Sequence, residues 1–250
     1  MEPTIYQPGA NKTPGIYKGA GVVYNGRGVY NDGAGGYNGP FVFLNNFYNI
    51  DNEKSKSEIG PDVLTPTNIF SLVNSDVFNG EKCLFMNVAG NAVSENNIDV
   101  ENTFTCETYF SNFNSISSSN IGKVRFGNIW VQLDGHVNSY RLQVPQGNYN
   151  LYNGASYITN VAQYNYFKIP ISLNTSNHVA CVIVDDFCYC FCNGTLFVKS
   201  QGIFQKNFNI IFYSENLTNI KCGINFLSIR NGNFSNNLTS FTVPSEKYRL

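Results

Sequence analysis

The sequence predicts an all-β protein, an antiparallel jelly-roll sandwich preceded by an extended N-terminal arm. Short runs rich in Val, Ile, Phe and Tyr recur from residue 67 onward, with Gly, Asn, Asp and Pro between them. Such spacing is typical of sandwiches and jelly rolls. The chain also contains 38 Asn and 22 Gly, which favour turns and oppose long helices. No window shows a sustained helical period of apolar residues, so we expect little helix.

The centre of the predicted fold is the segment 178–200, HVACVIVDDFCYCFCNGTLFVKS. Apolar residues fill successive positions of its first strand, which is typical of a strand covered on both faces. Asp185-Asp186 and Asn193-Gly194 then predict two tight turns, because Asn-Gly readily adopts the positive φ angles of a hairpin. We therefore expect three adjacent strands in the core.

Further strands are expected on both sides of this centre. Residues 69–78 and 83–88 form a pair around Asn79-Gly80, and residues 103–110 follow. Residues 124–133 form the next strand, which contains the single Trp and leads through Asp134-Gly135 to 140–144. Residues 164–173 enter the central segment, and 208–213, 221–230 and 240–243 complete the set.

Residues 1–40 form a separate Gly/Tyr-rich extended arm. Four tyrosines recur at spacings of six or seven residues, each followed closely by Gly: Tyr17, Tyr24, Tyr30 and Tyr37. So much Gly opposes a core of its own, because ordering Gly costs the most backbone entropy. Regular tyrosines favour an arm that binds a partner, and a flexible linker is the alternative. Residues 41–66 are expected to be a linker or anchoring segment, and residues 67–250 the sandwich domain.

Three segments carry a resemblance to a known family. They are residues 104–110 (FTCETYF), 178–196 (HVACVIVDDFCYCFCNGTL) and 224–230 (INFLSIR). In this order they resemble the strands of concanavalin A-like and laminin G-like jelly rolls, over about residues 67–243. Ser176, Asn177 and Asn225 depart from the residues usual in those domains. The resemblance implies the same sandwich fold.

The arm, TPGIYKGAGVVYNGRGVYNDGAGGYNGP, has a resemblance of its own. It is similar to the Gly-Ile-Tyr repeats at the N-termini of some capsid-associated proteins of large icosahedral DNA viruses. This implies a structural virion protein, a minor capsid component assembled in the host cytoplasm, and no enzyme activity. Its partners would be other capsid proteins, including a major capsid protein, and a homo-oligomer stays open.

Charge and hydropathy argue against nucleic acid and membrane. The formal net charge is −1 and the cations are scattered, whereas nucleic-acid binding needs a basic patch. No segment has the apolar length of a membrane-spanning helix. The start MEPTIYQPGANK has neither the basic nor the apolar region of a secretory signal. The seven cysteines are therefore expected to be reduced, buried thiols.

We expect neither a metal site on the cysteines nor a nucleophilic Cys-His pair. Cys188, Cys190 and Cys192 suggest a metal site, but residues two apart on a strand are about 6.6 Å apart, too far to share one zinc. We expect these cysteines to be packing residues. No nucleophile motif supports a Cys-His pair. Such a pair would have to combine His136 or His178 with Cys106 or Cys181.

Acidic residues offer two further alternatives. Related jelly rolls include glycoside hydrolases with a Glu-x-Asp-x-x-Glu motif, which this chain lacks. The remaining acidic cluster is expected in a loop: Glu95, Asp99 and Glu101. No cofactor is expected, although calcium stays open against ordinary solvated turn residues. Its candidate ligands are Asp134, Asp185 and Asp186.

Carbohydrate binding is the main alternative to the capsid role. Tyrosine rings offer stacking faces for sugars, and asparagine amides offer paired hydrogen-bonding groups. The segment 148–154, NYNLYNG, concentrates both residue types. It predicts a glycan site at Tyr149, Tyr152 and Asn153, on a virion or cell surface, against an ordinary surface loop.

Overall fold

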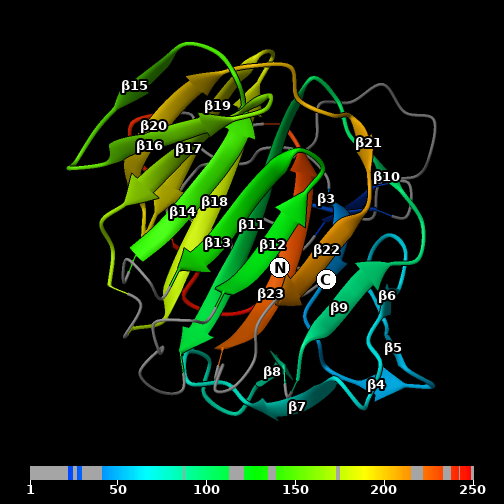
Figure 1. The fold of residues 1–250 in the computed structure, drawn as a ribbon. Coiled ribbons are helices and arrows are strands. Elements are labelled where there is room, and N and C mark those ends of the chain that lie inside the picture. Colours follow the sequence, from blue (N-terminus) through cyan, green and yellow to red (C-terminus); the bar gives the residue numbers. More distant parts are fainter. Residues whose placement is uncertain are drawn as a thin grey trace.

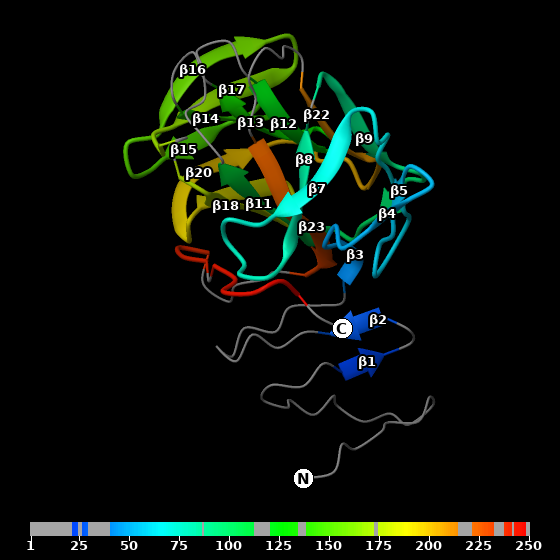
Figure 2. The ribbon, with the colours of Figure 1, turned by 90° about the horizontal axis from the view of Figure 1, so that it is seen from below.

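A computed structural model describes the chain over residues 22–24, 27–29, 41–86, 88–112, 121–134, 139–172, 175–214, 222–232, 238–241 and 243–248. Within these ranges every regular element is a β-strand, and every strand pairing is antiparallel. Two large sheets pack face to face as a sandwich, seen edge-on in Figure 2. The predicted all-β antiparallel sandwich is confirmed. No helix in the described part is long and apolar enough to cross a membrane.

The nine-stranded sheet has the order β15-β20-β19-β18-β11-β23-β8-β7, with β3 also paired to β23. Its strands are β3 (Phe41–Asn45), β7 (Phe70–Asn74), β8 (Lys82–Met86), β11 (Thr103–Asn112), β15 (Tyr149–Leu151), β18 (Asn177–Val184), β19 (Phe187–Cys192), β20 (Thr195–Gln201) and β23 (Cys222–Asn231). The predicted centre is thus confirmed as β18, β19 and β20. Asn193 and Gly194 turn between the last two with φ angles of 48° and 80°.

The ten-stranded sheet has the order β16-β17-β14-β13-β12-β22-β9-β6-β5-β4 and faces the viewer in Figure 1. Its strands are β4 (Ile50–Asp51), β5 (Lys54–Ser55), β6 (Val63–Leu64), β9 (Gly90–Ser94), β12 (Ile121–Phe126), β13 (Ile129–Asp134), β14 (Ser139–Pro145), β16 (Ser156–Val161), β17 (Tyr164–Ile169) and β22 (Ile210–Ser214). Two small pairs complete the described strands, β1 (Val22–Tyr24) with β2 (Arg27–Val29) and β10 (Ile98–Asp99) with β21 (Asn207–Phe208).

Two predicted strands differ from the structure. Residues 124–133 are not one strand, because Gly127 (φ 61°) turns the chain between β12 and β13. Residues 240, 241 and 243 belong to no strand, and Ser240 forms an isolated bridge with Thr195. Residues 41–66 supply β3 to the nine-stranded sheet and β4, β5 and β6 to the ten-stranded sheet. They are therefore built into the sandwich.

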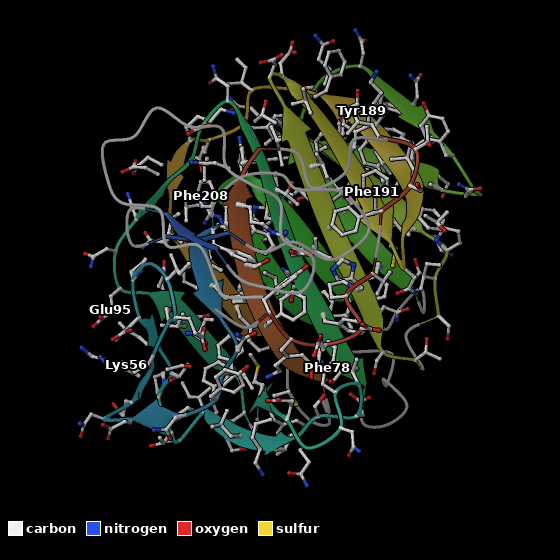
Figure 3. All side chains as sticks on the ribbon, turned by 180° about the vertical axis from the view of Figure 1, so that it is seen from behind. Lys56, Phe78, Glu95, Tyr189, Phe191 and Phe208 are labelled. Carbon is white, nitrogen blue, oxygen red and sulfur yellow. The ribbon has the colours of Figure 1, made fainter. Side chains whose placement is uncertain are left out.

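The nine-stranded sheet is buried on both faces. Its inner face meets the ten-stranded sheet in the main core. Its outer face is covered by the C-terminal segment, in which Phe241 packs over Phe191 and Tyr248 packs over Phe41 and Phe226. Figure 3 views this face and shows the segment (red) running past Phe191. This second layer explains why successive residues of β18 are buried, as the apolar run predicts.

Candidate functional site

Two tyrosines meet where the edges of the two sheets come together. β15 is the last strand of the nine-stranded sheet and β16 the last of the ten-stranded sheet (Figure 1). Tyr149 of β15 and Tyr157 of β16 stack with ring centroids 5.2 Å apart and an interplanar angle of 12°. Both rings also meet the buried Phe167 ring in edge contacts, at 4.9 Å and 6.0 Å. We call Tyr149 and Tyr157 the tyrosine pair.

The tyrosine pair is fixed from below and open to solvent. Each of the two side chains is 38% exposed, while Phe167 beneath them is 0% exposed. The pairing of β16 with β17 shifts by one residue between Tyr157 and Thr159. Such a bulge on an edge strand re-aims neighbouring side chains, and here Ile158 is also 38% exposed. The result is a rigid aromatic surface at the sandwich edge.

Tyr152 and Asn153 lie in the turn that follows β15. Tyr152 is 38% exposed and makes no ring contact with the described residues, and its backbone N–H donates to the carbonyl of Phe197. Asn153 adopts a φ of 50°, and its amide nitrogen donates to the Leu196 carbonyl at 2.8 Å. The protein itself therefore uses the donor of Asn153. Of the three predicted glycan residues, the structure brings only Tyr149 against another aromatic surface residue.

A buried polar cluster lies on the outer face of the nine-stranded sheet. The Glu107 carboxylate is 2.5 Å from the Arg230 guanidinium and 3.0 Å from Nε2 of His178. It also accepts a hydrogen bond from the Ser228 hydroxyl at 2.8 Å. Arg230 in turn donates to the Tyr248 hydroxyl at 2.7 Å. All five side chains are at most 3% exposed.

The electrostatics of this cluster favour an ionised Glu107. Burial raises its pKa, but the Arg230 charge and the hydrogen bond from His178 outweigh burial and lower the pKa to about 2. His178 also stacks on Phe241 of the covering segment, with centroids 5.4 Å apart. Because this segment seals the cluster from solvent, the cluster serves to attach the C-terminal segment to the sheet.

The six described cysteines are buried packing residues, as predicted. Cys188, Cys190 and Cys192 lie within the main core at 0–1% exposure. Burial raises the pKa of Cys192 to about 12, which keeps the thiol protonated and unreactive. Alternation along β18 places Cys181 on the core face and His178 on the outer face, so these two cannot form a nucleophilic pair.

The acidic candidates are dispersed. Glu95 pairs with Lys54 at 2.5 Å, and Asp99 accepts a hydrogen bond from Asn207 at 2.5 Å. Asp186 is exposed and accepts a hydrogen bond from Gln201. Among the described residues, no three His, Cys, Asp or Glu side chains gather so as to hold a metal ion. The Asp134 side chain and the whole of His136 lie outside the described residues.

The side chains of the four arm tyrosines lie outside the described residues. Tyr17, Tyr30 and Tyr37 lie outside the described residues, and Tyr24 is described only as the last backbone position of β1, opposite Arg27. The predicted partner-binding role of the arm stays a prediction.

Two features of the structure were not predicted from the sequence. Tyr157 lies eight positions after Tyr149 along the chain, and only the meeting of two sheet edges makes the residues neighbours. Glu107 belongs to a segment recognised by its resemblance, but its pairing with Arg230 requires the register of β11 against β23. An isolated charge within each of two apolar strands was the available signal, since buried charges are normally paired.

Comparisons with known proteins support the fold. The sequence matches no protein-family model and no curated protein. Trypanosoma rangeli sialidase is similar in structure, with a TM-score of 0.50 and 10% identity over 77% of this chain and 30% of the sialidase. The binding domain of botulinum neurotoxin DC in complex with SialylT has a TM-score of 0.50 and 12% identity over 77% of this chain and 47% of that one. The chain thus spans less than half the length of either, and the likeness shows a shared β-sandwich fold.

Proposed function

We propose that the protein is a carbohydrate-binding, lectin-like module and that a sugar ring packs on the tyrosine pair. One observation carries the proposal: two stacked tyrosines, each 38% exposed, rest on a fully buried phenylalanine. Large aromatic surfaces left in contact with water at a sheet edge are typical of binding sites. The proposal involves binding without a chemical step.

The geometry of the tyrosine pair suits a sugar. The faces of aromatic rings are electron-rich and attract the weakly positive C–H groups of a pyranose. The phenolic hydroxyls of Tyr149 and Tyr157 can each donate and accept hydrogen bonds with sugar hydroxyls. Because both rings pack against Phe167, little side-chain entropy remains to be lost on binding.

The structural neighbours support a carbohydrate ligand. One is a sialidase, and the other is a toxin binding domain in complex with SialylT. The resemblance of residues 178–196 to concanavalin A-like and laminin G-like domains also supports a carbohydrate ligand. These similarities guide the choice of glycans for a first screen, in which sialylated and neutral glycans are compared.

A glycan array followed by calorimetry of the best glycan tests the proposal. We expect Tyr149→Ala and Tyr157→Ala each to weaken binding by about tenfold or more, because each removes a ring worth roughly 1–2 kcal/mol of contact. Tyr157→Phe keeps the ring and is expected to retain most of the affinity. Tyr48→Ala is the matched control, since Tyr48 is 42% exposed and lies after β3, far along the sheet from β15.

Two outcomes would reject the proposal. One is a folded protein that binds no glycan on the array. The other is glycan binding that Tyr149→Ala and Tyr157→Ala leave unchanged, or that Tyr48→Ala weakens equally.

The minor capsid role stays a separate prediction. It rests on the Gly/Tyr arm, whose tyrosines are not placed, and on a sandwich body that suits either role. Mass spectrometry of purified virus particles, with and without residues 1–40, would test whether the arm attaches this protein to capsid proteins.

A further inference from the structure

The segment that carries the tyrosine pair contains no charged residue. Residues 142–167 include the whole of β15 and β16, and they have no Asp, Glu, Lys, Arg or His. Charged residues are 13% of the chain, so a stretch of this length is expected to contain several. The segment therefore offers a ligand aromatic rings, hydroxyls and amides.

The nearest lysines along the two sheets lie on other faces. Lys168 follows Phe167, and successive side chains of a strand point to opposite faces of a sheet. Because Phe167 packs beneath the tyrosine pair in the main core, Lys168 points away from the pair. Lys199 precedes Ser200, which is directly opposite Tyr149 and shares its face. Lys199 therefore also points away from the pair.

Strand register adds one polar side chain to the face of the tyrosine pair. Along β17, Phe167 and Asn165 are two residues apart and so share a face. Across the hairpin, Tyr157 is opposite Phe167, and Asn160 is opposite Asn165. Directly opposite residues of antiparallel strands share a face. Asn160 therefore lies on the face of the tyrosine pair, about 7 Å along the hairpin from Tyr157, and it is exposed.

The surface beside Asn160 is held in place by hydrogen bonds. Asn165 is 3% exposed, and its amide nitrogen donates to the Gly147 carbonyl at 2.8 Å. The backbone N–H of Gln146 donates to the Gln163 carbonyl, also at 2.8 Å. These two bonds attach the turn before β15 to the hairpin of β16 and β17. The tyrosine pair and Asn160 are thus positioned before a ligand arrives, which lowers the entropic cost of binding.

The amide of Asn160 suits two adjacent sugar hydroxyls. Its Nδ2 donates hydrogen bonds and its Oδ1 accepts them. One hydroxyl of a pyranose can accept from Nδ2 while the neighbouring hydroxyl donates to Oδ1. The carboxylate of a sialic acid, in contrast, needs a cation to offset the water that it loses on binding. Residues 142–167 supply no such cation.

We infer that the site is specific for neutral sugars and that Asn160 is its specificity-determining residue. The amide of Asn160 binds two adjacent hydroxyls of the pyranose that packs on the tyrosine pair. This inference rests on the proposed carbohydrate-binding function and names the ligand class. The tyrosine rings provide contact area to many sugars, whereas the amide distinguishes sugars by the positions of their hydroxyls.

A paired glycan array tests the neutral ligand class. Each sialylated glycan is compared with the same glycan after enzymatic removal of its sialic acid, using the full-length protein. We expect the neutral form to bind at least as tightly as the sialylated form, and its binding to be insensitive to salt because no charges pair. Binding that requires the sialic acid would overturn the inference.

Substitution of Asn160 tests its role. With the tightest neutral glycan of the array, Asn160→Ala should weaken binding about tenfold, because two hydrogen bonds are lost. Monodeoxy forms of that glycan give a readout that a structural role would not change. Removal of a hydroxyl that Asn160 binds should weaken binding to the wild type severalfold and leave binding to Asn160→Ala unchanged.

Controls separate recognition from folding. Asn150→Ala removes an exposed asparagine of β15 that is opposite Lys199 and points away from the tyrosine pair, and it should change binding less than twofold. Circular dichroism of each variant establishes folding. Asn160→Asp, which keeps the shape and loses the donor, serves if Asn160→Ala does not fold, and it should weaken binding severalfold.

The outcomes also distinguish this inference from the proposed function. If Tyr149→Ala and Tyr157→Ala weaken binding while Asn160→Ala binds within twofold of the wild type, the tyrosine site is supported and the role of Asn160 is overturned. Deoxy glycans that lose affinity equally for the wild type and Asn160→Ala would overturn that role as well. If Asn160→Ala weakens binding while both tyrosine variants bind normally, the proposed tyrosine site is rejected.

Discussion

Replacing Glu107 with glutamine should destabilise the fold strongly, because the carboxylate neutralises a buried cation. Its side chain is fully buried, 2.5 Å from Arg230 and 3.0 Å from His178. Glutamine keeps the shape and removes the charge, which leaves the Arg230 guanidinium buried without a counter-charge. Breaking a buried ion pair in this way costs about 3–5 kcal/mol.

The pKa of Glu107 predicts a destabilisation of similar size. The folded pKa is about 2, below the ordinary value of 4.5, so ionised Glu107 stabilises the fold at pH values above 4.5. This contribution is lost as the pH falls from 4.5 toward 2, and it amounts to about 3 kcal/mol. In a chain of this size the change corresponds to a fall in Tm of about 10 °C at pH 7.

Urea unfolding at pH 7 and at several pH values down to 2 provides the assay. Wild-type protein should lose stability steeply below pH 4.5, and Glu107→Gln should show a shallower loss over this range because it lacks the titrating group. Glu95→Gln is the matched control, since Glu95 pairs with Lys54 at the same 2.5 Å but at the surface, where a pair contributes less than about 1 kcal/mol. A loss below about 1 kcal/mol for Glu107→Gln, or an unchanged pH dependence, would refute the reasoning.

Three other predictions concern the C-terminal segment and the core. Gly194→Ala should lower Tm, because φ is +80° there and an added Cβ would collide with the Phe241 carbonyl; an unchanged Tm contradicts this. Burial lowers the pKa of Lys247 to about 8, so the contribution of Lys247 to stability should rise from pH 8 to 10.5, measured as the stability of the wild type minus that of Lys247→Met in urea; a difference that stays constant over this range contradicts this. The six described cysteines should resist iodoacetamide until unfolding, and mass spectrometry of the folded protein showing them labelled would contradict their burial.

The sequence was most informative where local rules govern the chain. The run of apolar residues in β18 and the Asn193-Gly194 turn predicted the central hairpins, because turn chemistry and alternation act over a few residues. The turn at Gly127 was missed because the apolar pattern continues on both sides of it, which made β12 and β13 resemble one strand.

The candidate site was only partly predictable. Tyr149 and Tyr152 were chosen from local composition. Composition could not show that the Tyr149 ring packs on other aromatic rings, whereas the Tyr152 ring makes no ring contact with the described residues. The partner ring of Tyr149 comes from another sheet, and the Phe167 beneath it is known only from the packing of β17. The pairing of Glu107 with Arg230 depends likewise on strands far apart in sequence.

The central claim is that a glycan binds on the tyrosine pair. The most direct measurement is an NMR titration of protein with labelled tyrosine rings, using the best glycan from the array and with resonances assigned by substitution. The account predicts that the ring signals of Tyr149 and Tyr157 shift and saturate together, while that of Tyr48 stays constant. Saturating glycan that leaves both ring signals unmoved would contradict it.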